Sequence, residues 1–188
     1  MTKADSTITL RKAVISDAHF IASTIISAMG LQESDNPSLI EALSAACTSE
    51  ETIYSYRNTT MALYGSERAG ALISYDGALY DRESANTFTL VSSYLGTRSF
   101  SPGKETGSGE YYLDSMSVLP QFRGHSIGSI LISNALEEAD ALGFDRVALI
   151  ADVKKPWLKS LYSRLGFKVE SETVFMGEPY YRMVQYIH

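Results

Sequence analysis

The sequence has few of the residues that build disulfide frameworks and metal sites. Among its 188 residues are one cysteine, Cys47, and three scattered histidines, His19, His125 and His188. A single thiol cannot form an internal disulfide, and these residues do not stand at the spacing of zinc ligands. We therefore expect neither a disulfide scaffold nor a bound metal.

Basic charge is also scarce, and long hydrophobic runs are missing. Sixteen lysines and arginines stand against 22 aspartates and glutamates, a net charge of −6. A protein that grips a nucleic-acid backbone needs a basic patch. The polar N-terminus has no signal-peptide core, and no apolar run approaches the roughly 20 residues that span a bilayer. We expect a cytoplasmic protein with a neutral or cationic substrate, and neither nucleic acid nor membrane as a partner.

Apolar material is plentiful, since 45% of the residues are hydrophobic. That is enough for one compact domain over residues 1–188 with a sizeable core. Segments with strand and helix periodicity alternate along the chain without an internal repeat, which predicts a mixed α/β fold.

The N-terminal third predicts a strand followed by two helices. Apolar and polar residues alternate around Ile8 and Leu10, as in a strand. Ser16 and Asp17 can cap a helix that Gly30 ends.

The second helix is expected to begin at Asn36 and Pro37. Ile40, Leu43 and Cys47 then share one face, which makes Cys47 a core residue rather than a nucleophile.

A hairpin and a less regular stretch follow. The hairpin pairs residues 61–64 with residues 69–75. Residues 76–109 are interpreted as an insertion in the single domain, with a helix over 84–95 and then a mobile loop rich in glycine and serine. Aromatic residues around this insertion either line a substrate pocket or bury it against the sheet: Tyr75, Tyr80, Phe88, Tyr94 and Phe100.

The C-terminal part has the clearest periodicity. Residues 110–118 alternate as a strand, which predicts that Tyr112, Asp114, Met116 and Val118 share one face. The remaining predicted elements are a helix from Ile127 to Gly143, a buried strand over 147–150, a helix from Pro156 to Gly166 and a last strand over 180–187.

Gly124 and Gly128 lie in the loop between that strand and the next helix. The first amides of a helix are unpaired and carry partial positive charge, so this loop can hold a phosphate. The spacing is neither that of a P-loop nor that of the dinucleotide fingerprint. A tight turn that needs glycine only for its geometry is an equally good explanation.

Two runs, taken together, resemble the GNAT superfamily of acetyl-CoA-dependent N-acyltransferases. They are Val-Leu-Pro-Gln-Phe-Arg-Gly at 118–124 and Leu-Tyr-Ser-Arg-Leu-Gly-Phe at 161–167, separated by one helix and one buried strand. The clear match covers residues 110–167. The resemblance implies a twisted, mixed, mostly antiparallel sheet with helices on both faces, and acetyl-CoA as the acyl donor.

The resemblance also implies a coenzyme site. The family binds the pyrophosphate of coenzyme A with the backbone of this loop, and pairs the pantetheine arm with the strand before it. The Val118 amide would polarise the thioester carbonyl. Ser126 departs from the pattern, because the family usually has glycine there. The implied coenzyme-binding residues are Met116, Ser117, Val118, Arg123, Gly124, His125, Ser126, Ile127, Gly128 and Ser129.

Three residues are candidates for proton transfer. An alkyl ammonium has a pKa of about 10.4, so a base must make the amine neutral. Asp114 is the first candidate base and Glu110 the second, although Asp114 can equally anchor a loop. Tyr162 is the candidate acid for the departing thiolate, a role that the resemblance favours over that of a core tyrosine.

These implications together predict an N-acetyltransferase that works by direct attack of a primary amine in a ternary complex. The alternative is a non-catalytic acyl-CoA sensor or assembly module on the same fold, because Ser126, Lys155 and Leu158 depart from the family pattern. The sequence decides neither the acceptor, a small molecule or a peptide, nor whether the chain forms a homodimer.

Overall fold

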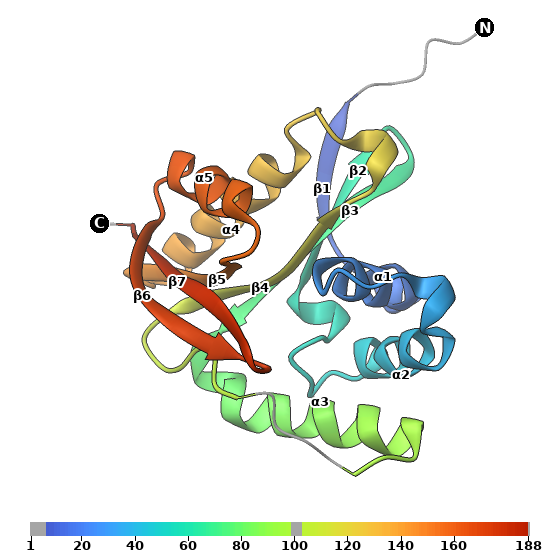
Figure 1. Ribbon diagram of the computed structural model, residues 1–188. Coiled ribbons are helices and arrows are strands. Elements are labelled where there is room, and N and C mark those ends of the chain that lie inside the picture. The colour runs from blue at the N-terminus through green and yellow to red at the C-terminus, as the bar shows by residue number, and fades with distance from the viewer. Residues whose placement is uncertain (1–6, 99–102, 188) are drawn as a thin grey trace, which may run out of the picture.

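The computed structural model describes residues 7–98 and 103–187, and its centre is a seven-stranded sheet in the order β1-β2-β3-β4-β5-β7-β6 (Figure 1). Neighbouring strands are antiparallel except β4 and β5, which are parallel. The sheet is therefore mixed and mostly antiparallel, as expected. Its strands are β1 (Ile8–Lys12), β2 (Thr59–Tyr64), β3 (Glu67–Asp76), β4 (Tyr111–Val118), β5 (Arg146–Asp152), β6 (Lys168–Phe175) and β7 (Glu178–Tyr186).

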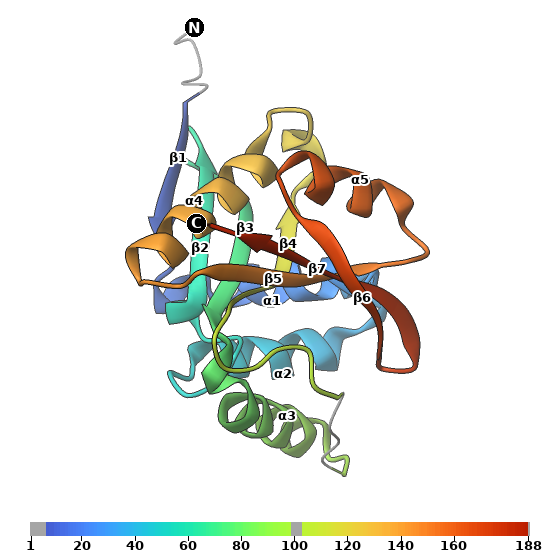
Figure 2. The same ribbon diagram turned by 90° about the vertical axis from the view of Figure 1, so that its left-hand side faces the viewer.

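Helices cover both faces of the sheet. One face carries α1 and α2, with α3 below them, and the other carries α4 and α5 (Figures 1 and 2). No helix of the described ranges is long and apolar enough to cross a bilayer. The helices are α1 (Ala18–Ala28), α2 (Pro37–Thr48), α3 (Tyr80–Leu95), α4 (Ile127–Ala141) and α5 (Pro156–Arg164).

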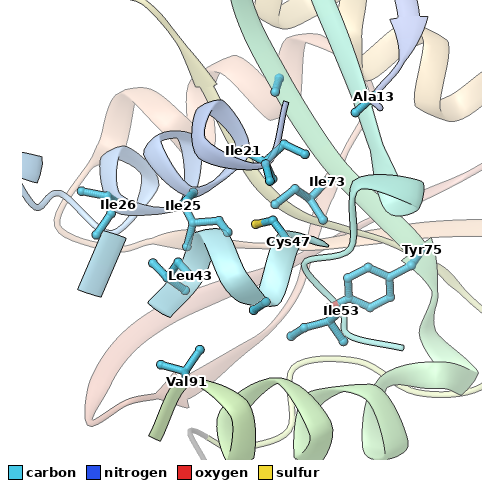
Figure 3. Close-up of a cluster of buried hydrophobic side chains, with 14 of the residues drawn as sticks. Ala13, Ile21, Ile25, Ile26, Leu43, Cys47, Ile53, Ile73, Tyr75 and Val91 are labelled. Atoms are coloured by element: carbon cyan, nitrogen blue, oxygen red, sulfur yellow. The ribbon is translucent and has the colours of Figure 1, made fainter. Parts of the chain in front are cut away.

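In the core on the first face, aliphatic side chains surround Cys47. Ile21, Ile25 and Leu43 from α1 and α2 meet Ile73 from β3 around the thiol (Figure 3). Cys47 has no exposed surface, and burial raises the pKa of its thiol. Because the reactive thiolate is suppressed there, the prediction of a core cysteine is confirmed.

The start of α1 is fixed by a buried ion pair rather than by a side-chain cap. The helix begins directly after Asp17, as predicted, but this carboxylate caps no helical amide. It accepts bonds from Arg11 (2.7 Å), from Arg68 (2.8 Å) and from the Val14 amide (2.9 Å). Burial opposes ionisation, yet these partners together lower its pKa to about 2. The carboxylate thus joins β1, β3 and α1.

Most of the predicted elements are confirmed, with two differences. Helix α3 begins at Tyr80, four residues before the predicted start at Ser84. Strand β6 was not predicted, because its residues are mostly exposed and lack apolar alternation. It pairs only with β7, at the edge of the sheet.

The loop after α3 is anchored in the part that the structure describes. Phe100 lies outside the described residues. The backbone carbonyl of Gly103 accepts a bond from the Tyr80 hydroxyl (2.8 Å), and that of Glu105 accepts one from Arg182 (2.9 Å). Bonds at Gly103 and Glu105 therefore link this part of the loop to α3 and β7, and the mobility of the loop stays a prediction.

Candidate active site

The central feature of the site is an opening between β4 and β5. The two strands pair only at Tyr111 with Val147 and at Tyr112 with Ala148. Beyond Tyr112 they separate, while β4 stays paired with β3 as far as Val118 and β5 stays paired with β7 as far as Asp152. One edge of β4 is therefore free to pair with a ligand.

The register shows which amides of β4 face this opening. The Leu119 amide donates to the Ala69 carbonyl (2.8 Å), and Val118 stands opposite Gly70. Antiparallel residues alternate in the direction of their backbone groups. Since Leu119 points toward β3, the amides of Val118 and Met116 point toward the opening.

A bulge in β4 changes which side chains share a face. Leu72 stands opposite Met116 and Ser74 opposite Leu113, so Asp114 and Ser115 together face the single residue between them on β3. An extra residue reverses the alternation beyond it. The prediction that Asp114 shares a face with Met116 and Val118 is therefore wrong.

The two faces can be followed through their contacts. Tyr112 packs in the core beneath α1 and α2, and Asp114 bonds to Tyr75 of the same core. Met116 and Val118 pack instead against the core beneath α4 and α5. The strand thus presents the Asp114 side chain to one layer of helices and the Met116 and Val118 side chains to the other, while its free amides point along the sheet into the opening.

A small cavity at the opening brings the predicted acid and base together. It is lined by Asp114 and Met116 of β4, Ile150 of β5 and Tyr162 of α5, with Leu72, Leu113, Ile132 and Leu149 around them. The Tyr162 ring packs edge-on against Phe167, and burial raises the pKa of its hydroxyl to about 12. The phenol is therefore protonated and able to donate across the physiological range.

Asp114 has hydroxyl partners and no cationic one among the described residues. Its carboxylate accepts bonds from the hydroxyls of Tyr75 (2.6 Å) and Ser115 (2.8 Å). Burial raises its pKa, and these two hydrogen bonds oppose the rise without cancelling it. A carboxylate whose pKa is raised is the stronger proton acceptor.

The glycine loop presents a row of free amides at the mouth of the opening. None of the six amides from Gly124 to Ser129 donates to a protein acceptor among the residues that the structure describes, and the first helical bond of α4 runs from Ile130 to Ser126. These amides and the helix dipole are what a diphosphate needs. The residues present fit coenzyme A.

The loop's backbone uses left-handed conformations at two positions. Gly124 has φ +84° and Ser126 has φ +61°. Serine adopts this conformation only at an energetic cost, so Ser126 occupies a glycine-like position. Arg123 donates from Nε to the Val118 carbonyl (3.2 Å), and the His125 ring packs on Tyr64.

Two more predicted coenzyme residues have contacts of their own. The Ser117 hydroxyl bonds to Ser27 of α1 (3.0 Å), so this side chain points away from α4. A Cβ placed on Gly128 would stand 3.4 Å from Met116, so the first turn of α4 lies directly against β4.

Glu110, the second candidate base, is held in an ion-pair cluster. It accepts bonds from Arg146 (3.0 Å), from Arg182 and from the Thr106 hydroxyl (2.6 Å). Burial opposes ionisation, but these partners outweigh it and lower its pKa. A carboxylate stabilised as an anion in this way is a poor proton acceptor at neutral pH.

One acidic residue of this region escaped the sequence analysis. Glu105, in the loop before β4, accepts bonds from the hydroxyls of Tyr112 (2.7 Å) and Tyr80 (3.3 Å). Burial, and then the charge of Asp114, raise its pKa to about 8. No local signal marks this residue, because its partners come from distant parts of the chain. No group of three potential metal ligands gathers anywhere in the described ranges.

Comparisons with known proteins identify a single family. The family model described as the acetyltransferase (GNAT) family matches residues 38–167. No curated protein matches the chain.

Several solved structures resemble the chain over nearly its whole length. One described as an acetyltransferase is 25% identical, with a TM-score of 0.78 over 96% of this chain and all of the other. An N-acetyltransferase from Staphylococcus aureus Mu50 is 19% identical, with a TM-score of 0.75 over 94% of this chain and 99% of the other. The PaiA N-acetyltransferase from Thermoplasma acidophilum, solved with coenzyme A, is 16% identical, with a TM-score of 0.61 over 96% and 99%.

Proposed function

Because the chain belongs to the acetyltransferase (GNAT) family, we propose that it acetylates a primary amine by direct transfer from acetyl-CoA, with both substrates bound at once. The observation that carries the proposal is the opening between β4 and β5. Free amides lie at its mouth, and Asp114 and Tyr162 line the cavity inside it.

The backbone binds the donor. The amides from Gly124 to Ser129 hold the diphosphate, and the free edge of β4 pairs with the pantetheine arm. The amides of Met116 and Val118 face that arm, and the Val118 amide donates to the thioester carbonyl oxygen as negative charge develops there. Bound acetyl-CoA supplies an acetyl thioester, whose carbonyl carbon forms a bond to the amine nitrogen as its C–S bond breaks.

Two side chains move the protons. Asp114 takes a proton from the acceptor's ammonium group, which makes the nitrogen nucleophilic. Tyr162 gives its proton to the departing sulfur. The nitrogen loses a second proton as it becomes an amide, and that proton restores the Tyr162 hydroxyl. The net products are the acetylated amine, the free thiol of coenzyme A and one proton released to solvent.

Tyr162→Phe tests the acid. We expect turnover to fall about 100-fold, because the phenol proton is lost, while the Kd for coenzyme A stays within about threefold. Thiol release measured over a panel of primary amines gives the first quantity, and titration calorimetry the second. Tyr94→Phe is the matched control, since Tyr94 is exposed on α3, on the far side of the sheet.

Two outcomes would count against the proposal. A Tyr162→Phe variant with normal turnover would remove this residue from the mechanism. Tight coenzyme binding by the unaltered protein, with no thiol release for any amine, would instead indicate the non-catalytic sensor.

A further inference from the structure

Few backbone bonds hold the loop between β4 and α4. The Arg123 amide donates to the Pro120 carbonyl (3.3 Å). Among the residues that the structure describes, Gly124 and His125 then take part in no backbone hydrogen bond, and the next bond is accepted by Ser126. The positive φ angles of Gly124 and Ser126 do not favour this conformation over others. The shape of the loop therefore depends on side-chain contacts.

The side chain of Tyr64, the last residue of β2, supplies two such contacts. Its ring stacks on that of Phe122, with centroids 5.4 Å apart and an angle of 30° between the planes. It also packs on the ring of His125, with centroids 4.9 Å apart. Phe122 and His125 flank Arg123 and Gly124 in the sequence. Tyr64 therefore contacts the loop on both sides of its first left-handed residue.

The sheet fixes the backbone of Tyr64. This residue stands opposite Ile8 of β1 and Glu67 of β3, and the Gly65 amide after it donates to the Thr7 carbonyl (2.9 Å). The Tyr64 ring is half-buried and packs against the core beneath α4 and α5. Strand β2 is separated from the opening by β3 and β4. Tyr64 thus connects a well-bonded strand outside the opening to a loop that has few bonds of its own.

We infer that Tyr64 is a positioning residue for the donor, because its ring holds the loop so that the amides from Gly124 to Ser129 keep the direction in which they bind the diphosphate. The inference rests on the proposed function, in which these amides bind coenzyme A. Tyr64 acts through the loop and does not itself contact the coenzyme. A loop that is ordered before the ligand arrives loses less conformational freedom on binding, which raises the affinity.

Tyr64→Leu is the direct test, since it removes the ring and keeps an apolar side chain at the end of β2. We expect the Kd for coenzyme A, measured by titration calorimetry, to rise about tenfold, because both ring contacts are lost. Tyr64→Phe keeps the ring and should leave the Kd within about twofold. An unchanged Kd in Tyr64→Leu would overturn the inference, and so would an equal loss of affinity in Tyr64→Phe.

Phe175→Leu is the matched control. Phe175 ends β6 at the opposite edge of the sheet, is half-buried like Tyr64, and packs edge-on against Tyr180 with centroids 6.2 Å apart. This change should lower stability in urea unfolding but leave the Kd for coenzyme A within about twofold. A tenfold rise here as well would assign the Tyr64 effect to a general loss of stability, against the inference.

Turnover separates donor binding from chemistry. In Tyr64→Leu the KM for acetyl-CoA should rise with the Kd, while kcat at saturating donor stays within about twofold, because the loop binds the ground state and the transition state equally. A lowered kcat with an unchanged KM would contradict a role in donor binding.

A double-mutant cycle tests whether Tyr64 acts through the loop. His125→Ala removes one of the two ring contacts at an exposed residue of the loop, and should raise the Kd for coenzyme A about threefold. In the Tyr64→Leu background the same change should have little further effect, because its partner is already gone. Effects that multiply would show that His125 acts independently of Tyr64, and would overturn the inference.

A measurement without ligand or turnover completes the test, and it uses His125→Ala, which leaves the core intact if Tyr64→Leu does not fold. In the unaltered protein, nitrogen-15 relaxation should give the amides from Gly124 to Ser126 order parameters of about 0.85, and in His125→Ala these should fall toward about 0.6. Loop amides of unchanged rigidity would overturn the inference. An unaltered protein that does not bind coenzyme A would instead overturn the proposed function, whatever the relaxation shows.

Discussion

At the scale of single residues, Ser126 is the non-glycine residue with a left-handed backbone in the loop that we propose to bind coenzyme A. Its left-handed backbone lets the following amides point outward together at the start of α4. A side chain in this conformation costs about 1–2 kcal/mol, which glycine does not pay in the folded state. The conformation of Ser126 therefore lowers the stability of the folded protein and orients the amides that follow it.

Ser126→Gly should raise the free energy of unfolding by about 0.5–1 kcal/mol, after allowing for the greater freedom of glycine in the unfolded chain. In the proposed function the loop binds the diphosphate through backbone amides, so the Kd for coenzyme A should stay within about threefold. Urea unfolding and calorimetry measure the two effects.

Met176→Gly is the matched control for this change. Met176 is the other described non-glycine residue with positive φ, at +50°, in the turn between β6 and β7. It should show a similar gain in stability. A tenfold loss of affinity in Ser126→Gly alone would assign the binding to the serine hydroxyl instead.

At the scale of elements, the loop before β4 depends on close backbone contact at Gly77. A Cβ built there would lie 2.2 Å from the Gly107 carbonyl, and the Gly77 amide donates to the Glu110 carbonyl (2.9 Å). Any larger residue must push the loop away from β3. The loop carries Glu105 and Thr106, so the carboxylate network would shift with it.

Gly77→Ala should lower the free energy of unfolding by about 2–3 kcal/mol, because backbone atoms cannot yield to the added methyl group. Gly107→Ala, in the same loop, is the control, since its Cβ would meet only the Lys104 side chain at 3.5 Å. Urea unfolding compares the two variants. Equal stability of both would contradict the described contact.

The same scale shows where sequence patterns succeed and fail. The glycine loop and most helix boundaries were predictable, because caps, glycines and prolines act within a few residues of their own position. The bulge at Asp114 and Ser115 was not, because it exists only relative to β3. Strand β6 gave no apolar alternation, since as an edge strand it buries little.

The candidate site was predictable to a similar degree. The motif residues of the coenzyme loop and Tyr162 lie in contiguous runs, so a single sequence suffices to locate them. Glu105 lies in a run of turn-forming residues, and its environment is created by Tyr80, Tyr112 and Arg182, which are remote in the chain. Such long-range contacts have no local signature.

At the scale of the whole molecule, buried acids set the pH dependence of stability. Glu105 and Asp114 have raised pKa values, so the folded state holds more protons than the unfolded chain, and stability falls as pH rises from about 4 toward 8. Asp17 and Glu110 have lowered pKa values, so their contribution is lost as pH falls below about 4 and, for Asp17, toward about 2.

The protein without ligand should therefore be most stable near pH 5. Between pH 5 and pH 8.5 we expect the free energy of unfolding to decrease by roughly 2 kcal/mol, and Glu105→Gln should remove much of that decrease. Urea unfolding at pH 3, 5, 7 and 8.5 measures the curve. A constant value above pH 5 would contradict the raised pKa values.

The ion-pair cluster around Glu110 has a mechanical consequence. Glu110 directly precedes β4, and Arg146 is the first residue of β5. Their bond therefore links the two strands at the end where they pair, and Arg182 connects β7 to the same carboxylate. The cluster thus joins two parts of the sheet, β1 to β4 and β5 to β7, at the point from which they diverge. Neutralising Glu110 would allow the angle between these two parts to vary. A residue that touches no ligand would then change the affinity for coenzyme A.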